Sequence, residues 1–228
     1  MREDLVYIGT GNGGQSDEGA EIRLAKDSLP GVSQQEGGIA DAQVLRMTYL
    51  VDVASADSLH RRREITEVIF DRESFSAMQL TSLASDSGVA RQVETRVRGA
   101  GLDVRVHGDH GSDRTLTLPW GPDAVFYDSL PVWLRGLDLE KPARFAIRML
   151  PTQTSARGRN LKLEPAIILI IGPAGPPSET SHGGLEADMH YEGKVDKLWF
   201  HPGPHHILLV WEKADGTELT LHSIGTGK

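Results

Sequence analysis

The sequence predicts an all-β protein: a curved antiparallel meander, half-barrel or barrel-like, with one short helical cap. Three observations favour this fold class. Apolar and polar residues alternate along many short segments, which is the two-residue period of a strand with one buried face. Turn-forming residues, including 25 glycines, separate these segments. A sheet with so many strands must curl or fold over to protect its edges.

The first 41 residues are the least regular part of the chain. Only Leu5–Ile8 and Glu21–Leu24 have the character of short strands there, in a glycine-rich context. From residue 42 the alternation becomes sustained. We therefore expect a glycine-rich N-terminal extension with short strands over residues 1–41 and a single β domain over residues 42–228.

Within the β domain, strands are predicted in order from the alternation and from the turns between them. They are expected at Gln43–Val53, Glu64–Asp71, Phe75–Leu83, Val89–Arg98, Leu102–His107, Thr115–Leu118, Arg144–Leu150, Ala166–Ile171, Leu185–Glu192, Val195–His201, His206–Lys213 and Thr217–Ser223. Gly99–Gly101 and Asp215-Gly216 indicate tight hairpin turns, since glycine adopts the positive φ that such turns require. Ala166–Ile171 is apolar on both faces, which predicts a central strand covered on both sides.

The segment 126–139, FYDSLPVWLRGLDL, interrupts the alternation and predicts a short helix. Ser129 or Asp128 suits the N-cap, and Pro131 suits the first turn. The apolar face of this helix is expected from three leucines at helical spacing, Leu130, Leu134 and Leu137. Gly136 would end the helix as a C-cap. We expect this segment to close one end or the concave face of the sheet, as a cap or plug.

The composition argues against several classes of function. The formal net charge of −8 disfavours binding to nucleic acids or to anionic lipid surfaces. Without cysteine, the chain has no disulfide, thiolate metal site or cysteine nucleophile. The longest apolar run, Ala166–Ile171, is too short to span a membrane, and the N-terminal residues show no signal-peptide pattern. A soluble protein with no transmembrane segment is expected.

Sequence motifs for catalysis are also missing. Gly9–Gly14 matches a phosphate-binding glycine pattern, but no amphipathic helix and no βαβ unit follows it, so we interpret it as a glycine-rich turn. The sequence contains no nucleophile elbow, no zinc-protease helix motif and no phosphate-loop lysine. We therefore predict no catalytic residues, no cofactor and a non-enzymatic protein.

Histidines offer the one candidate for a metal site. His201, His205 and His206 flank a Pro-Gly-Pro turn, and neutral imidazole is a common metal ligand. Adjacent histidines on a strand point to opposite faces, so His205 and His206 cannot easily bind the same ion. These three residues are weak candidates for metal ligands.

Aromatic residues suggest a binding site for an apolar ligand. Trp133 lies in the predicted cap, whereas Trp199 and Trp211 lie in the C-terminal strands. If these side chains line one concavity, they form the kind of apolar pocket that binds small hydrophobic molecules. Arg135 projects from the same cap and is a candidate for binding a ligand carboxylate, although an anchoring role is the simpler interpretation.

Two blocks of the sequence, Asp128–Leu139 and Leu198–Leu221, resemble a family of bacterial β-rich proteins that carries a domain-of-unknown-function label. The resemblance extends from Leu45 to Leu221. Members of that family are about as long as this chain and are mostly exported. The resemblance implies a curved antiparallel sheet and a location in the periplasm or cell envelope, by analogy with lipid-carrier half-barrels. It implies no catalytic residues.

Together these observations predict a non-enzymatic module that binds an apolar small molecule, such as a lipid, or a protein partner in the bacterial cell envelope. Two alternatives stay open. One is a metal-dependent hydrolase that uses the turn with His201, His205 and His206. The other is a structural β-protein that pairs through a sheet edge. The sequence does not specify the oligomeric state.

Overall fold

The computed structural model describes residues 2–10, 17–29, 42–54, 61–71, 74–86, 89–107, 113–151, 161–175, 182–203 and 205–227. In these ranges the chain is mostly β-strand, with one short helix. The strands of the N-terminal half are β1 (Arg2–Thr10), β2 (Asp17–Leu29), β3 (Ala42–Ala54), β4 (Arg61–Asp71), β5 (Ala77–Asp86), β6 (Val89–Arg98), β7 (Gly101–His107) and β8 (Arg114–Pro119). Those of the C-terminal half are β9 (Ala124–Phe126), β10 (Ala143–Leu150), β11 (Glu164–Pro173), β12 (Leu185–Tyr191), β13 (Lys194–Phe200), β14 (Leu208–Glu212) and β15 (Glu218–Gly227).

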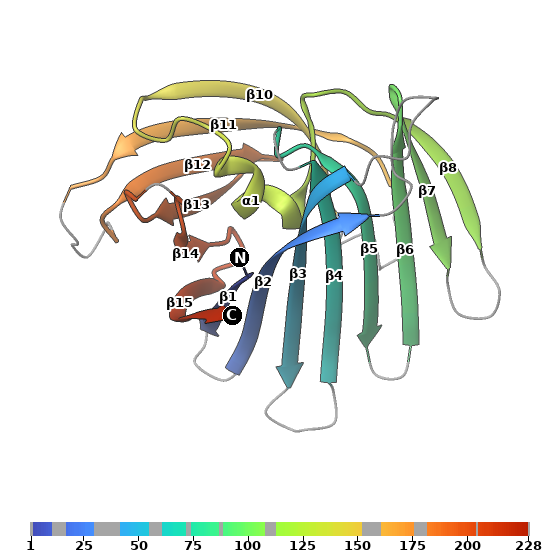
Figure 1. Cartoon of the computed structure of the whole chain (residues 1–228), viewed down its shortest axis with the longest axis horizontal. Coiled ribbons are helices and arrows are strands. Elements are labelled where there is room, and N and C mark those ends of the chain that lie inside the picture. The colour runs from blue at the N-terminus through green and yellow to red at the C-terminus, as the bar shows by residue number, and fades with distance from the viewer. Residues whose placement is uncertain are drawn as a thin grey trace.

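All fifteen strands belong to one strongly curled sheet (Figure 1). Its strand order is β8-β7-β6-β5-β4-β3-β2-β1-β15-β14-β13-β12-β11-β10-β9. Strands that follow one another in the chain are therefore neighbours in the sheet, except β8 and β9, and β1 is the neighbour of β15. Among the described pairings only β9 with β10 is parallel. No described pairing joins β8 to β9, so the curled sheet is not a closed barrel. The predicted all-β, antiparallel, barrel-like fold class with one short helix is confirmed.

The two ends of the chain meet in the middle of this sheet. β1 pairs antiparallel with β15, from Arg2 opposite Gly227 to Thr10 opposite Glu218. Figure 1 shows the N and C labels close together at this place. The segments Leu5–Ile8 and Glu21–Leu24 lie within β1 and β2. The predicted division after residue 41 falls between β2 and β3, which pair along their whole length.

An ion pair holds in place the segment that connects β8, at one edge of the sheet, to β9, at the other edge. Arg148 on β10 donates two hydrogen bonds of 2.7 Å to the Asp123 carboxylate, and its backbone N–H donates to the Asp123 carbonyl at 2.8 Å. A further, longer bond of 3.4 Å reaches the Pro119 carbonyl at the end of β8. The connection between β8 and β9 is therefore held against β10.

Replacing Arg148 by Gln is expected to lower the melting temperature slightly at pH 7 and not at strongly acidic pH. The hydrogen bond from Arg148 is the main cause that lowers the pKa of Asp123 below its ordinary value of 3.8. A lowered pKa stabilises the fold above pH 3.8, and this contribution is lost as the pH falls through the lower folded value. Both side chains are more than a third exposed, so screening limits the effect to about 0.5–1 kcal/mol.

Thermal unfolding of the Arg148→Gln variant between pH 7 and about pH 2.5 checks this prediction. Arg144→Gln, an exposed arginine on the same strand, is the matched control and should change little at any pH. A loss of stability at Arg148→Gln that is the same at both ends of the pH range would contradict the ion-pair explanation.

Alternation along the strands gives the sheet one buried, concave face. On β11 the residues Ala166, Ile168 and Ile170 are buried in the core, whereas Ile171 is 43% exposed. The prediction that Ala166–Ile171 is covered on both sides is therefore wrong. In the described residues the outer face of β11 lies against no second layer of sheet or helix, so its apolar residues there stay partly exposed.

The segment after β9 fills the concave side of the sheet. It consists of the 3-10 helix η2 (Tyr127–Ser129), the α-helix α1 (Leu130–Leu134) and a connection to β10. Figure 1 shows α1 inside the curve of the sheet. Four residues of α1 are buried: Leu130, Pro131, Val132 and Leu134. We call residues 127–142 the plug segment.

Two details of the plug segment differ from expectation. Ser129 is the N-cap of α1, but its hydroxyl donates to the Phe126 carbonyl at 2.8 Å and makes no capping bond to the helix. The prediction of Gly136 as C-cap is wrong, because Arg135 takes that place. Gly136 has a different reason to be glycine: an added Cβ would lie 3.2 Å from the Phe75 side chain.

Candidate functional site

A buried carboxylate connects the plug segment to the sheet. Asp196 on β13 is fully buried and accepts four hydrogen bonds from groups far apart in the sequence. Its Oδ2 accepts from the Tyr127 hydroxyl at 2.7 Å and from Trp211 Nε1 at 3.1 Å. Its Oδ1 accepts from the Tyr191 hydroxyl at 3.0 Å and from the Ala214 backbone N–H at 2.9 Å. We call these five residues the Asp196 network.

Electrostatics keep the two tyrosines of the Asp196 network protonated. Burial is the main cause that raises the pKa of both Tyr127 and Tyr191, and the charge of Asp196 raises them further. Both hydroxyls therefore stay donors at any physiological pH. Since both carboxylate oxygens of Asp196 already accept two donors each, this network is an anchor for the plug segment and holds no vacant base.

The polar interior continues next to the Asp196 network. Lys213 is 8% exposed, and its Nζ donates to the Tyr49 hydroxyl at 3.4 Å. The same Nζ lies 5.0 Å from the ring centre of Trp211, within the range of a cation–π interaction. Close by along the sheet, the Tyr7 hydroxyl donates to the Leu208 carbonyl at 2.9 Å. These contacts connect strands from both halves of the chain beneath the plug segment.

Half-buried apolar side chains gather where α1 ends. Trp133 packs edge-on against Phe145 of β10, with ring centres 6.5 Å apart. Phe75, from the turn between β4 and β5, contacts Gly136. Leu137 is also only partly buried, and all four side chains pack against the edge of the core. We call Phe75, Trp133, Leu137 and Phe145 the rim patch.

Backbone conformation at two turns is strained where they meet the plug segment. Phe75 has φ of 54° and His206 has φ of 42°, two of only three non-glycine residues with positive φ in the described part of the chain. Such a conformation costs about 1–3 kcal/mol and is kept only where the surroundings enforce it. For Phe75 the enforcing group is Asp71, whose carbonyl accepts from the Phe75 N–H at 3.0 Å and whose carboxylate accepts from the Ser74 N–H and hydroxyl, each at 2.8 Å.

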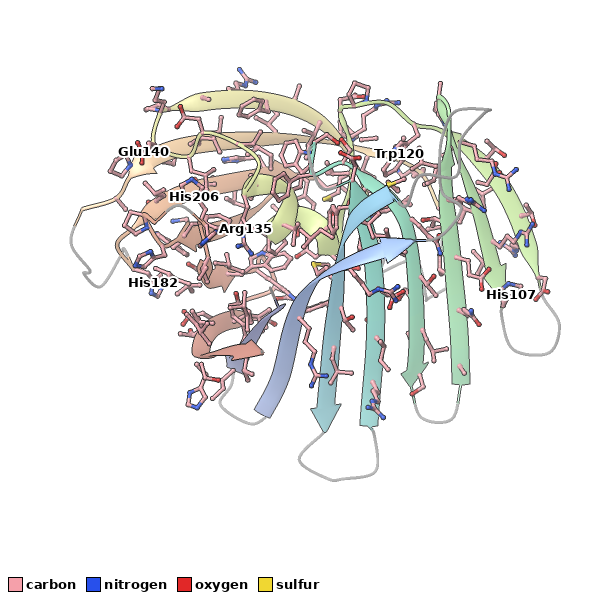
Figure 2. The ribbon with its side chains drawn as sticks, in the orientation of Figure 1. His107, Trp120, Arg135, Glu140, His182 and His206 are labelled. Atoms are coloured by element: carbon pink, nitrogen blue, oxygen red, sulfur yellow. The ribbon has the colours of Figure 1, made fainter. Side chains whose placement is uncertain are left out.

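His206 lies beside the residues that follow α1. The pKa of Asp138 is lowered chiefly by a hydrogen bond from Lys141 and, to a smaller extent, by the charge of His206. The Nδ1 atom of His206 is buried and has no hydrogen-bond partner among the described residues. Figure 2 shows His206 and Arg135 in the same half of the view, where α1 and the C-terminal strands lie.

The structure brings together only some of the residues predicted for a ligand site. Trp133 and Arg135 lie at the rim, and both are half-buried. Trp211 points into the core within the Asp196 network. Trp199 belongs to the opposite face of the sheet, where its ring packs edge-on against His182 with centres 4.6 Å apart. Trp199 therefore does not share a concavity with Trp133 and Trp211.

The histidine turn is mostly open to solvent. His201 and His205 are exposed, and His206 is partly buried against the plug segment. Among the described residues no group of three or more histidine, aspartate or glutamate side chains is placed so that it could hold a metal ion.

No protein-family model matches this chain, and no curated protein matches it. Among solved structures, the chain is similar to the crystal structure of a beta-barrel-like protein of Domain of Unknown Function DUF1849 from Brucella abortus. The TM-score is 0.57 and the identity 10%, over 98% of this chain and 96% of the other. The two proteins share a fold. This finding confirms the coarser part of the predicted resemblance, a β-rich fold found in a domain-of-unknown-function family.

None of the described helices is both long and apolar enough to span a membrane.

Sequence reasoning missed the central role of Asp196 and the presence of Phe75 and Phe145 at the rim. The Asp-x-x-Ser turn at Asp71 was the available local signal for an ordered loop at Phe75. Nothing local indicated that this loop would contact Gly136, which lies far along the chain.

Proposed function

We propose that this protein is a non-enzymatic binding module whose rim patch takes an apolar small molecule. The observation that supports this function is the clustering of three aromatic side chains and one leucine, all half-buried, beside the helix that fills the sheet. Small-molecule sites are lined mainly by such aromatic and aliphatic side chains. The strain at Phe75 fits this role, because strained residues concentrate at functional sites.

The surroundings of the rim patch support binding and not chemistry. The buried carboxylate of the Asp196 network has its oxygens occupied by four donors. The large apolar side chains that are exposed among the described residues lie outside the rim patch and are spread over several strands: Ile8, Leu83, Ile171, Val195 and Ile224. Single exposed apolar residues of that kind are normal on protein surfaces, whereas a cluster is not.

Substitution of Phe145 by Ser is expected to weaken binding of an apolar probe at least about fivefold, since it removes one aromatic wall of the patch. The measurement is a titration with N-phenyl-1-naphthylamine, a neutral dye whose fluorescence rises in apolar surroundings. Ile171→Ser is the matched control, because Ile171 is a large apolar residue exposed on the outer face. Its affinity for the dye should equal that of the unmodified protein.

Two results would overturn this proposal. One is the absence of saturable dye binding by the unmodified protein. The other is an equal loss of affinity in the Phe145→Ser and Ile171→Ser variants, which would show that the dye binds the surface without preference for the rim patch. Melting temperatures of both variants exclude unfolding as the cause of any difference.

A further inference from the structure

A charged side chain beside the rim patch indicates which kind of headgroup a ligand would carry. Arg135 is half-buried and follows α1 directly, between Trp133 and Leu137 in the sequence. Its backbone N–H donates to the Val132 and Trp133 carbonyls, so the position of this residue is set by the end of the helix. The guanidinium therefore starts from a fixed point next to the apolar side chains that would hold a ligand.

The acidic residue nearest in sequence to Arg135 is already paired with another cation. The Asp138 carboxylate accepts from Lys141 Nζ at 2.8 Å. Arg135 has an interaction of its own within the protein. A guanidinium has five N–H donors, so it can serve a protein partner and a bound oxyanion together.

His206 lies near the loop that follows Arg135, since its charge contributes to the lowered pKa of Asp138. Its Nδ1 is buried without a hydrogen-bond partner among the described residues, and its backbone is held in the left-handed region by a bond from its N–H to the Gly203 carbonyl at 3.1 Å. A buried polar atom without a partner costs free energy unless a ligand or water completes it. A ligand lying on the rim patch does not reach this buried Nδ1 atom, so Arg135 is the group left to bind its headgroup.

We infer that the ligand of the rim patch is a single-chain amphipath with an oxyanion headgroup. Its apolar chain lies on Trp133, Phe145 and the neighbouring apolar side chains, and its headgroup binds Arg135. This inference rests on the proposed function and specifies the chemistry of its ligand. Charge complementarity selects an anion over a neutral or cationic headgroup.

A structural role for Arg135 is the competing explanation. A cationic side chain at a helix C-terminus interacts favourably with the helix dipole and with the last carbonyls of the helix. That role predicts a loss of stability on substitution and no dependence of binding on the charge of the headgroup. The two explanations can therefore be separated by ligands that share one apolar chain and differ only in the charge of the headgroup.

The test compares decanoate, decyl phosphate, decanol and decyltrimethylammonium, which share one chain and differ in headgroup. Isothermal titration calorimetry below the micelle concentration measures their affinities. We expect decanoate or decyl phosphate to bind at least about tenfold more tightly than decanol, and the ammonium compound to bind most weakly. The order of decanoate and decyl phosphate identifies carboxylate or phosphate as the preferred oxyanion.

Substitutions of Arg135 test whether this residue binds the headgroup. Arg135→Met is expected to lower the affinity for the preferred anion about tenfold and to leave the affinity for decanol unchanged. Arg135→Lys should keep part of the anion preference, since it keeps the charge but not the planar fork. Arg144→Met, an exposed arginine on β10, is the control and should behave as the unmodified protein.

The outcomes separate this inference from the proposed function. Binding of decanol as tight as that of both anions overturns the headgroup inference and leaves apolar binding intact. Equal losses for anion and decanol in Arg135→Met also overturn it, because a merely structural role predicts that pattern. Should Arg135→Met fail to fold, the headgroup series on the unmodified protein still decides. Absence of binding for all four compounds counts against the proposed function itself.

Discussion

Substitution of Asp196 by Ala is expected to reduce the free energy of unfolding by about 3–5 kcal/mol, the largest effect of any single polar substitution considered for this protein. The change removes, at a fully buried position, the acceptor of two tyrosine hydroxyls, of the Trp211 indole N–H and of the Ala214 backbone N–H. Each orphaned donor costs about 1–3 kcal/mol on its own, although such costs are not additive.

Urea denaturation monitored by circular dichroism checks this expectation. Glu212→Ala removes an exposed carboxylate from the neighbouring strand and should change stability by no more than about 0.5 kcal/mol. Tyr127→Phe removes one donor and should cost about 1 kcal/mol, well below the cost of removing Asp196. A cost below about 1 kcal/mol for Asp196→Ala would show that the Asp196 network does not anchor the plug segment.

Substitution of Leu134 by Ala is expected to cost about 2–5 kcal/mol, because it creates a cavity at a fully buried position of α1. Leu137→Ala offers a matched control three residues later. Leu137 belongs to the rim patch and is only partly buried, so the same chemical change should cost roughly half as much or less.

This pair of variants tests the placement of the helix. Denaturation curves for both should show unchanged m-values and different midpoints. Equal costs for Leu134→Ala and Leu137→Ala would contradict a plug segment that buries α1 and leaves the rim patch half-exposed.

The strands could be predicted from local alternation because a strand with one buried face has the same two-residue period wherever it lies in the sheet. The faces could not be assigned in the same way. On β13 one face has Asp196, Leu198 and Phe200, and the other has Val195 and Trp199. Composition favours neither face clearly, so the sequence leaves open which face of the sheet Trp199 occupies.

Features that depend on contacts between distant parts of the chain could not be predicted from local sequence patterns. The pairing of β1 with β15 joins residues at opposite ends of the chain, and no local pattern encodes which strands become neighbours. The interior position of Asp196 was hidden as well, because an isolated aspartate in a strand is normally solvent-exposed. Only the arrival of Tyr127, Tyr191 and Trp211 from three other elements makes its burial favourable.

The short helix was predictable because its signals are local. Leucines at helical spacing and a proline at the first turn lie within a dozen residues of each other. The C-terminal end of the helix was not predictable. Gly136 suits that place because Phe75, from a distant turn, leaves little room for a side chain. Sequence thus indicated the plug segment itself but not what it touches.

The central claim, that an apolar ligand binds at the rim patch, is tested most directly by nuclear magnetic resonance of the tryptophan indoles. The chain has four tryptophans, so its spectrum contains four indole N–H signals. On titration with decanoate, the account predicts a large shift of the Trp133 signal and small changes at Trp199 on the outer face and Trp211 in the Asp196 network. An unchanged Trp133 signal at saturation, or a largest shift at Trp199, would contradict it.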